Sequence, residues 1–400
     1  MAVFAGQPSH RSGQPVRPIW LSSLAAMGVA VATVAFGPQA GAAQVATGAA
    51  GSGPSWRIVH GAALAHNNVL NGLAVVSKRL AWAVGSQGFS SDGTLPGRPV
   101  MERWNGHSWS VVRLPTTWPG GLAAIAASSA TNAWALGQNF SGTRQHLLHW
   151  NGHVWQASRF PGTQGVLTGN LGLTAARGGR AWLIAAASDA PSTQIFGHIG
   201  ARWQRQRYTC PAGVCNLYQI AARTGTDAWA VGNYASGPTG GPLALHWKGR
   251  GWRVTPMPYV PMGYLTGVFG ASATSAWAVG AVFGTSQMLL YRWNGSTWRQ
   301  VQVPAALTPP SFFELTGITG DSLGHLWIYD FGLPTADRAS YLHYNGHRWS
   351  VIQGAVIAGQ TQVTVRAVAI VPGTSVAWSV GLGMVPTVNA RARIERYGRI

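Results

Sequence analysis

The sequence predicts an all-β fold, a seven-bladed β-propeller of four-stranded antiparallel blades. Three observations predict it: two aromatic motifs that alternate along the chain, a repeat of about 50 residues, and repeats that are incomplete at the ends. The second motif, typified by R-W-N-G-S-T-W, follows the first by about 20 residues. The first motif, typified by A-W-x-x-G, recurs every 47 to 52 residues, with its tryptophan at Trp82, Trp134, Trp182, Trp229, Trp277, Trp327 and Trp378.

Each repeat contains four short runs with the composition of strands. In the second repeat these runs are Leu122–Ala127, Ala133–Gln138, His146–Trp150 and Trp155–Phe160. Four antiparallel strands, repeated radially, form the blades of a propeller. Seven first motifs therefore predict seven blades over residues 56–400.

The ends of the repeat array predict how the ring closes. The chain stops at Ile400, just before the last aromatic strand of the seventh repeat is due. The missing strand has a counterpart at the other end, because Trp56–Val59 (WRIV) is similar to Trp109–Val112 (WSVV). A propeller must close, since open blades expose unpaired strand edges. We therefore expect Trp56–Val59 to complete the last blade beside the 393–397 segment.

Residue choice inside the repeats agrees with this architecture. In Ala81–Gly85, alternation places Trp82 and Val84 on one face of the strand and small residues on the other. Large side chains facing small ones let neighbouring sheets interlock.

The second motif predicts tight hairpins. Aromatic residues flank its turn, so Trp104 and Trp109 are expected to meet across the two strands. Asn-Gly favours a two-residue turn in which both residues adopt positive φ. The pairs are Asn105-Gly106, Asn151-Gly152, Asn294-Gly295 and Asn345-Gly346.

These repeats resemble those of secreted bacterial Trp-rich β-propellers and, distantly, kelch and Asp-box (sialidase-type) propellers. The G-S-T-W of Gly295–Trp298 is similar to the end of an Asp-box, with Asn294 directly before the glycine. The resemblance covers about residues 56–400. It implies a propeller and leaves binding, scaffolding and glycoside hydrolysis open, because propellers host all three.

The N-terminus has the organisation of a secretory signal, predicted to span residues 1–42. Arg11 and Arg17 precede an apolar stretch, Ile19–Phe36, and Ala40-Gly41-Ala42 offers a cleavage site. The alternative is a retained membrane anchor, because 18 apolar residues are at the lower limit for spanning a bilayer. Residues 43–55 are predicted to be a flexible linker. We expect a secreted or cell-surface protein, with no membrane span after cleavage.

Two cysteines, Cys210 and Cys215, are separated by four residues. An exported chain meets an oxidising environment, so they are predicted to form a disulfide. No His or Cys cluster accompanies them, and we expect neither a metal nor a cofactor.

Charge suggests the class of partner. The chain carries 28 Lys and Arg, nine Asp and Glu, and a formal net charge of +19. The basic residues are dispersed, which argues against specific nucleic-acid binding. We expect a monomer whose partner is an extracellular glycan, an anionic polymer or a protein.

The candidate ligand-binding residues are aromatic side chains outside the repeat register. They fall in connections that share one face of a propeller, where ligands usually bind. They are Trp118, Tyr234, Tyr259, Tyr264, Phe312, Phe313 and Phe331, with Phe283 in an equivalent turn. The tryptophans in register are predicted to be core.

An enzyme is the alternative, in the form of a sialidase-like glycosidase, and an envelope protein–protein scaffold is a third interpretation. Glycoside hydrolysis usually needs paired carboxylates. Glu314, Asp330 and Asp337 form the one cluster the sequence offers, whereas Glu102 and Glu395 share a repeat position and are predicted to be structural.

Two further expectations concern titratable groups. His149, His246 and His343 occupy a position that other repeats fill with arginine, and this exchange predicts a solvent-facing cation. Acid unfolding mostly follows the protonation of paired carboxylates. With nine acidic residues, the chain is expected to keep nearly constant stability from neutral to strongly acidic pH.

Overall fold

A computed structural model describes the chain in segments. They are residues 54–90, 94–162, 171–186, 190–236, 239–285, 287–304, 307, 317–321, 324–329, 337–385 and 389–399. The predicted signal peptide, and the predicted linker up to residue 53, lie outside these residues.

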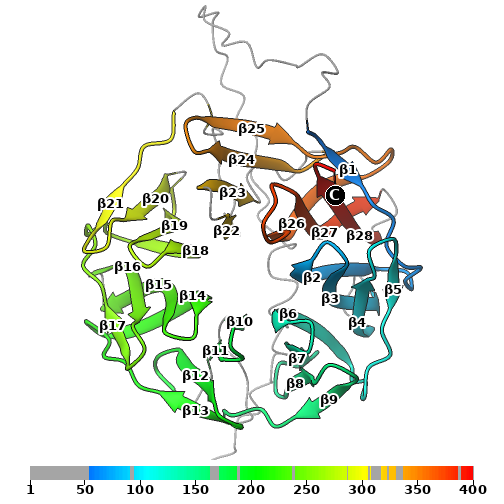
Figure 1. The fold of residues 1–400 in the computed structure, drawn as a ribbon, viewed down its shortest axis with the longest axis horizontal. Coiled ribbons are helices and arrows are strands. Elements are labelled where there is room, and N and C mark those ends of the chain that lie inside the picture. The colour runs from blue at the N-terminus through cyan, green and yellow to red at the C-terminus, as the bar shows by residue number, and fades with distance from the viewer. Residues whose placement is uncertain are drawn as a thin grey trace, which may run out of the picture. The chain divides into compact units, whose positions relative to one another are not determined.

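The described residues form seven four-stranded antiparallel sheets arranged in a ring (Figure 1). Blade 1 contains β2 (Asn68–Ser77), β3 (Leu80–Phe89), β4 (Pro96–Trp104) and β5 (Trp109–Val111). Blade 2 contains β6 (Gly120–Ser129), β7 (Asn132–Asn139), β8 (Gln145–Trp150) and β9 (Trp155–Ser158). Blade 3 contains β10 (Gly172–Ala175), β11 (Ala181–Ala185), β12 (Gln194–Ile199) and β13 (Arg202–Gln206).

The remaining blades repeat this order. Blade 4 contains β14 (Val214–Thr224), β15 (Asp227–Ser236), β16 (Thr239–Trp247) and β17 (Trp252–Val254). Blade 5 contains β18 (Gly263–Ser272), β19 (Ser275–Val282), β20 (Met288–Trp293) and β21 (Trp298–Gln300). Blade 6 contains β22 (Gly317–Gly320), β23 (His325–Tyr329), β24 (Ser340–Asn345) and β25 (Trp349–Gln353). Blade 7 contains β26 (Thr361–Ile370), β27 (Ala377–Val385), β28 (Asn389–Tyr397) and β1 (Trp56–Ile58).

The seventh blade closes as predicted, because its outer strand comes from the N-terminal side of the chain. In β1, Trp56 pairs with Tyr397 and Ile58 with Glu395. The Val59 amide donates to the Ile394 carbonyl at 2.9 Å and extends the ladder by one bond. The ring is therefore joined by hydrogen bonds between its first and last strands (Figure 1).

The two aromatic motifs pack together between neighbouring blades. The A-W tryptophan of each blade lies against the hairpin aromatics of the next blade: Trp229 of blade 4, for example, lies 5.3 Å from Trp293 and 5.1 Å from Trp298 of blade 5. The last contact returns to the start, since Trp378 of blade 7 lies 5.0 Å from Trp104 of blade 1. The repeat therefore encodes the blade-to-blade interface as well as the blade.

Trp56 shows why the closing strand needs an aromatic residue. Its ring stacks on Tyr341 of blade 6 with centroids 4.3 Å apart, and it meets Trp327 edge-on at 5.3 Å. The side chain is 4% exposed. The strand thus completes blade 7 and also fills the interface with blade 6.

The hairpin turns differ from the prediction. Trp104 and Trp109 do pair across the strands, with ring centroids 5.8 Å apart, but the connection is longer than two residues. The Asn105 side-chain oxygen accepts the amides of His107 and Ser108 at 2.9 Å each. Gly106 has positive φ, and Asn105 does not. The asparagine acts by capping two amides, so its own backbone need not be left-handed.

The prediction of a solvent-facing cation is wrong for His246. This histidine is 3% exposed, stacks on Trp229 at 3.7 Å, and donates from Nε2 to Asp227 at 2.7 Å. His149 similarly stacks on Trp134 at 4.0 Å. The position places a flat cation or imidazole over the A-W tryptophan, and stacking explains the exchange with arginine.

The structural role predicted for the two glutamates is confirmed. Glu102 is 1% exposed and accepts the Ala62 amide at 2.9 Å, and Glu395 is 2% exposed and accepts the Ala355 amide at 3.2 Å. Each anchors the segment that connects the preceding blade to its own. Burial raises the pKa of both carboxyls, and the Arg393 guanidinium partly opposes this at Glu395.

Truncating the closing tryptophan should destabilise the whole ring. Trp56→Ala removes a buried aromatic side chain from the interface of blades 6 and 7. We expect the free energy of unfolding to fall by about 3–5 kcal/mol in urea titrations. Arg57→Ala is the control, because Arg57 is an exposed residue of the same strand. Equal stability of the two variants would contradict the role assigned to Trp56.

Four half-buried histidines change the expected acid response. Burial lowers the pKa of His343 to about 4 and also lowers the pKa of His146, His149 and His198. Between pH 6.5 and 4, the unfolded chain binds protons that the folded imidazoles do not bind, so stability falls as pH falls. The expectation of constant stability considered carboxylates alone and omitted this contribution.

The contribution of His343 can be isolated by substitution. The raised pKa values of Glu102 and Glu395 act in the opposite direction, so the test compares variants and not absolute slopes. Because the ring is partly exposed, we expect His343→Gln to reduce the loss of unfolding free energy between pH 6.5 and 4 by about 1 kcal/mol. His107→Gln, at an exposed turn, should leave the pH profile unchanged. Parallel profiles for both variants would refute this assignment.

Candidate functional site

A repeated β-bulge positions the side chains at the centre of the ring. In five inner strands the pairing register skips one residue, for example between Leu70 and Gly72 and between Leu265 and Gly267. A bulge leaves the extra residue unpaired and re-aims its side chain. Each of these pairings has a second register shift elsewhere, and the residues skipped at this bulge are Asn71, Ala123, Tyr218, Thr266 and Arg366.

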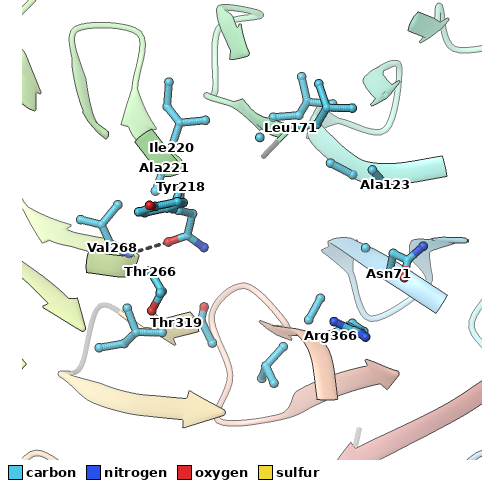
Figure 2. A pocket seen from close by; sticks show the side chains of 18 of the residues that line it. Asn71, Ala123, Leu171, Tyr218, Ile220, Ala221, Thr266, Val268, Thr319 and Arg366 are labelled. Atoms are coloured by element: carbon cyan, nitrogen blue, oxygen red, sulfur yellow. Dashed lines mark hydrogen bonds between the residues drawn. The ribbon is translucent and has the colours of Figure 1, made fainter. Parts of the chain in front are cut away.

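These residues line a cavity of about 670 Å³, here called the central channel, to which the inner strands of all seven blades contribute. Figure 2 shows their side chains arranged around one shared space. The polar side chains Tyr218, Thr266, Thr319, Arg366 and Asn71 follow one another through blades 4 to 7 and blade 1 (Figure 2). Ala123 and Leu171 make the opposite side apolar. The volume is in the range of small-molecule sites.

Arg366 dominates the electrostatics of the channel. Among the described residues that line it, Arg366 is the one with a charged side chain, and none is a carboxylate. Its Nε atom is buried and has no hydrogen-bond partner within the described segments. A guanidinium can form two parallel hydrogen bonds to a carboxylate or phosphate. The channel therefore offers an anion a guanidinium whose Nε has no protein partner among the described residues.

Tyr218 supplies a neutral hydroxyl opposite the arginine. Burial raises the pKa of its phenol, and the neighbouring Tyr264 raises it further. The phenol therefore stays protonated at neutral pH. The next residue, Gln219, accepts the amide of Val268 with its side chain and ties blade 4 to blade 5. This side of the channel is held in place by contacts that involve no ligand.

The disulfide predicted from the sequence is present and supports this strand. Cys210 and Cys215 are bonded, with Cα atoms 5.9 Å apart. Cys215 belongs to β14 and is fully buried, and Tyr218 follows it by three residues. The bridge fixes the segment through which the chain enters β14.

The structure separates the predicted aromatic residues. Tyr264 and Phe283 line the central channel. Tyr259 is 56% exposed, while Tyr234 is half-buried against the core of blades 3 and 4. Phe312, Phe313 and Phe331 lie outside the described residues.

Trp118 packs within blade 2 and is not among the described residues that line the central channel. It is 6% exposed, stacks on His146 with ring centroids 4.0 Å apart, and donates from Nε1 to the Gln138 carbonyl at 3.1 Å. Its position outside the repeat register indicated a binding residue. The register reflects one kind of core contact, however, and Trp118 makes another within blade 2.

The carboxylate cluster considered for hydrolysis is described only at Asp337. Its side chain is about half exposed and pairs with Arg338 at 2.8 Å, and this residue does not line the channel. Glu314 and Asp330 lie outside the described residues. Within the segments that the structure describes, no three His, Cys, Asp or Glu side chains are grouped to hold a metal ion.

Sequence reasoning missed Arg366 and the other bulge residues. A signal was present, because the bulge residue precedes the A-W tryptophan by eleven positions at Asn71, Ala123, Tyr218 and Thr266, and by twelve at Arg366. The side chains at this position vary widely, so a search for shared residue types passes over them.

The described part of the chain contains no helix of the length and apolarity needed to cross a membrane.

Comparisons with known proteins support the fold. No family model matches the sequence, and no curated protein matches it. Among solved structures, the chain is similar to YCF48 from Cyanidioschyzon merolae, with 12% identity over 86% of this chain and 98% of that one and a TM-score of 0.52. It is also similar to the β-propeller domain of the Trilobed protease from Pyrococcus furiosus, with 7% identity over 83% and 94% of the two chains and a TM-score of 0.52.

A third similar structure is the GH74 xyloglucanase from Xanthomonas campestris. Identity is 13%, the TM-score is 0.53, and the match covers 85% of this chain and 55% of that one. At these identities the likenesses show the fold alone. The chain is a seven-bladed β-propeller with a central channel, and its chemistry must be argued from its own residues.

Proposed function

We propose that this propeller is a non-catalytic binding module that takes a carboxylate-bearing glycan in its central channel. The observation that carries the proposal is the buried Nε of Arg366, which has no protein partner among the described residues and lies in a cavity shared by all seven blades. A buried donor without a partner is costly, and an anionic ligand would satisfy it. The polar sector beside it supplies hydroxyl and amide groups that suit a sugar.

Long-range electrostatics favours the same class of ligand. Removal of residues 1–42 would take away Arg11 and Arg17 and leave a net charge of +17, since 28 minus 2 minus 9 is 17. A strongly positive surface speeds the encounter with anionic polymers, and this attraction weakens as the salt concentration rises. The channel then selects, because a guanidinium discriminates a planar carboxylate from a neutral group.

The two other functions suggested by the sequence receive less support. A sialidase-like hydrolase would need acidic groups at the cavity. Asp337 instead forms an ion pair with Arg338 away from the cavity. No surface feature of the described residues favours a protein–protein scaffold over a ligand-binding module. Kinship with kelch or Asp-box propellers stays a proposal that rests on Gly295–Trp298.

The channel is tested by replacing its cation. Arg366→Met keeps much of the side-chain length and removes the charge. We expect wild-type protein to bind glucuronate and not glucose in titration calorimetry, and the variant to lose about tenfold or more in affinity, as for a charged hydrogen bond. Arg299→Met changes the net charge equally at an exposed position of β21 and should bind normally. Unchanged affinity in Arg366→Met, or equal binding of glucuronate and glucose, would overturn the proposal.

We also propose that the protein is exported and that residues 1–42 are cleaved. The Cys210–Cys215 disulfide supports this, because such bridges persist in oxidising compartments. Intact mass of the protein from the medium or cell surface should correspond to a chain that begins at Ala43. A full-length chain in the membrane fraction would instead indicate a retained anchor.

A further inference from the structure

The exposed aromatic rings of the described residues belong to the link between blades 4 and 5 and to blade 5 itself. Among the described residues, all tryptophans are buried or half-buried, and the exposed aromatic side chains are Tyr259, at 56%, and Phe283, at 61%. Met262, whose backbone is hydrogen-bonded to Phe283 and Gly240, is 53% exposed. Single exposed apolar residues are normal, but a group of them beside a cavity indicates a binding surface.

One of the exposed rings, Phe283, adjoins the central channel. Phe283 lies 5.1 Å from Tyr264, and Tyr264 lies 6.2 Å from Tyr218, one of the bulge residues. Tyr264 and Phe283 are both part of the channel lining. We call Tyr218, Tyr264, Phe283, Met262 and Tyr259 the aromatic track. It runs from the channel across blade 5 to the edge of blade 4.

Backbone contacts hold the outer part of the track in place without a ligand. The Phe283 amide donates to the Met262 carbonyl at 3.0 Å, and the Met262 amide donates to the Gly240 carbonyl at 3.2 Å. The Tyr259 ring lies over Gly241, where a side chain would meet it at 3.2 Å. Contacts between three separate segments therefore hold this part of the track in place. Binding would lose little conformational entropy in ordering it.

The track is neutral, whereas the channel is cationic. The segment 255–264 (TPMPYVPMGY) and the turn 282–285 (VFGT) contain no Asp, Glu, Lys or Arg. A ligand complementary to both parts has an anionic group at one end and uncharged rings with apolar faces beyond it. The C–H face of a pyranose packs well on an aromatic ring, and its hydroxyls remain in water at the rim.

We infer that the ligand is an oligosaccharide chain that places a uronic-acid carboxylate at Arg366 and stacks following sugar rings on Tyr264, Phe283 and Tyr259. This inference rests on the proposed function and extends it from a charged group to a polymer. The oligosaccharide leaves the channel over blade 5, because the aromatic track lies on that side. The track supplies affinity that grows with chain length, and the channel supplies the requirement for the acid.

The test compares two probes and matched variants by titration calorimetry. The probes are glucuronate and a hexasaccharide of glucose units that ends in one glucuronate. The double variant Tyr259→Ala/Phe283→Ala truncates exposed side chains, so its fold is expected to persist, as circular dichroism would show. Val154→Ala, 51% exposed on an outer hairpin, is the control for loss of exposed apolar surface.

We expect wild type to bind the hexasaccharide about 100-fold more tightly than glucuronate, roughly tenfold for each exposed ring. The double variant should lose most of this gain and bind glucuronate as wild type does, whereas Arg366→Met should weaken both probes. If the double variant binds the hexasaccharide with wild-type affinity, the inference about the aromatic track is wrong, while the proposed function of the channel is unaffected. Unaltered glucuronate binding in Arg366→Met would overturn the proposed function instead.

Discussion

The contact between an A-W tryptophan and the hairpin aromatics of the following blade is the interaction on which the rest of the structure depends. It recurs around the ring and returns from Trp378 to Trp104 and Trp109. Dispersion and burial make each contact favourable, and aromatic geometry gives it direction. Because every blade takes part in this contact on both of its sides, removing the closing strand β1 would leave one interface incomplete. Trp56 prevents this at blades 6 and 7.

Closing the ring has a consequence for the centre. Seven inner strands converge, and bulges at equivalent positions turn one residue of most blades toward a common space (Figure 2). Since the outer motifs carry the packing, these inner positions are free to vary. They hold Asn71, Tyr218, Thr266 and Arg366 at one part and alanine and leucine at another. A regular frame thus presents an irregular, chemically distinct site.

The few acidic residues of the chain occupy specific structural positions. Glu102 and Glu395 anchor blade connections from buried positions, and Asp227 fixes the histidine that covers Trp229. Carboxylates in the described part of the chain therefore serve the scaffold, and the channel is left to a cation. The acid response also depends on half-buried imidazoles, because the folded chain binds protons less readily at these groups than the unfolded chain does.

The sequence by itself determined the blade number, the four-strand repeat, the closure by residues 56–58 and the disulfide, because each depends on local periodicity or on spacing along the chain. Tertiary structure decided the site. Arg366, Asn71 and Tyr218 are about 150 residues apart or more and share no residue type, and only convergence of the inner strands makes them neighbours. Trp118 shows the reverse: a tryptophan outside the register is buried by His146, a partner that only the fold supplies.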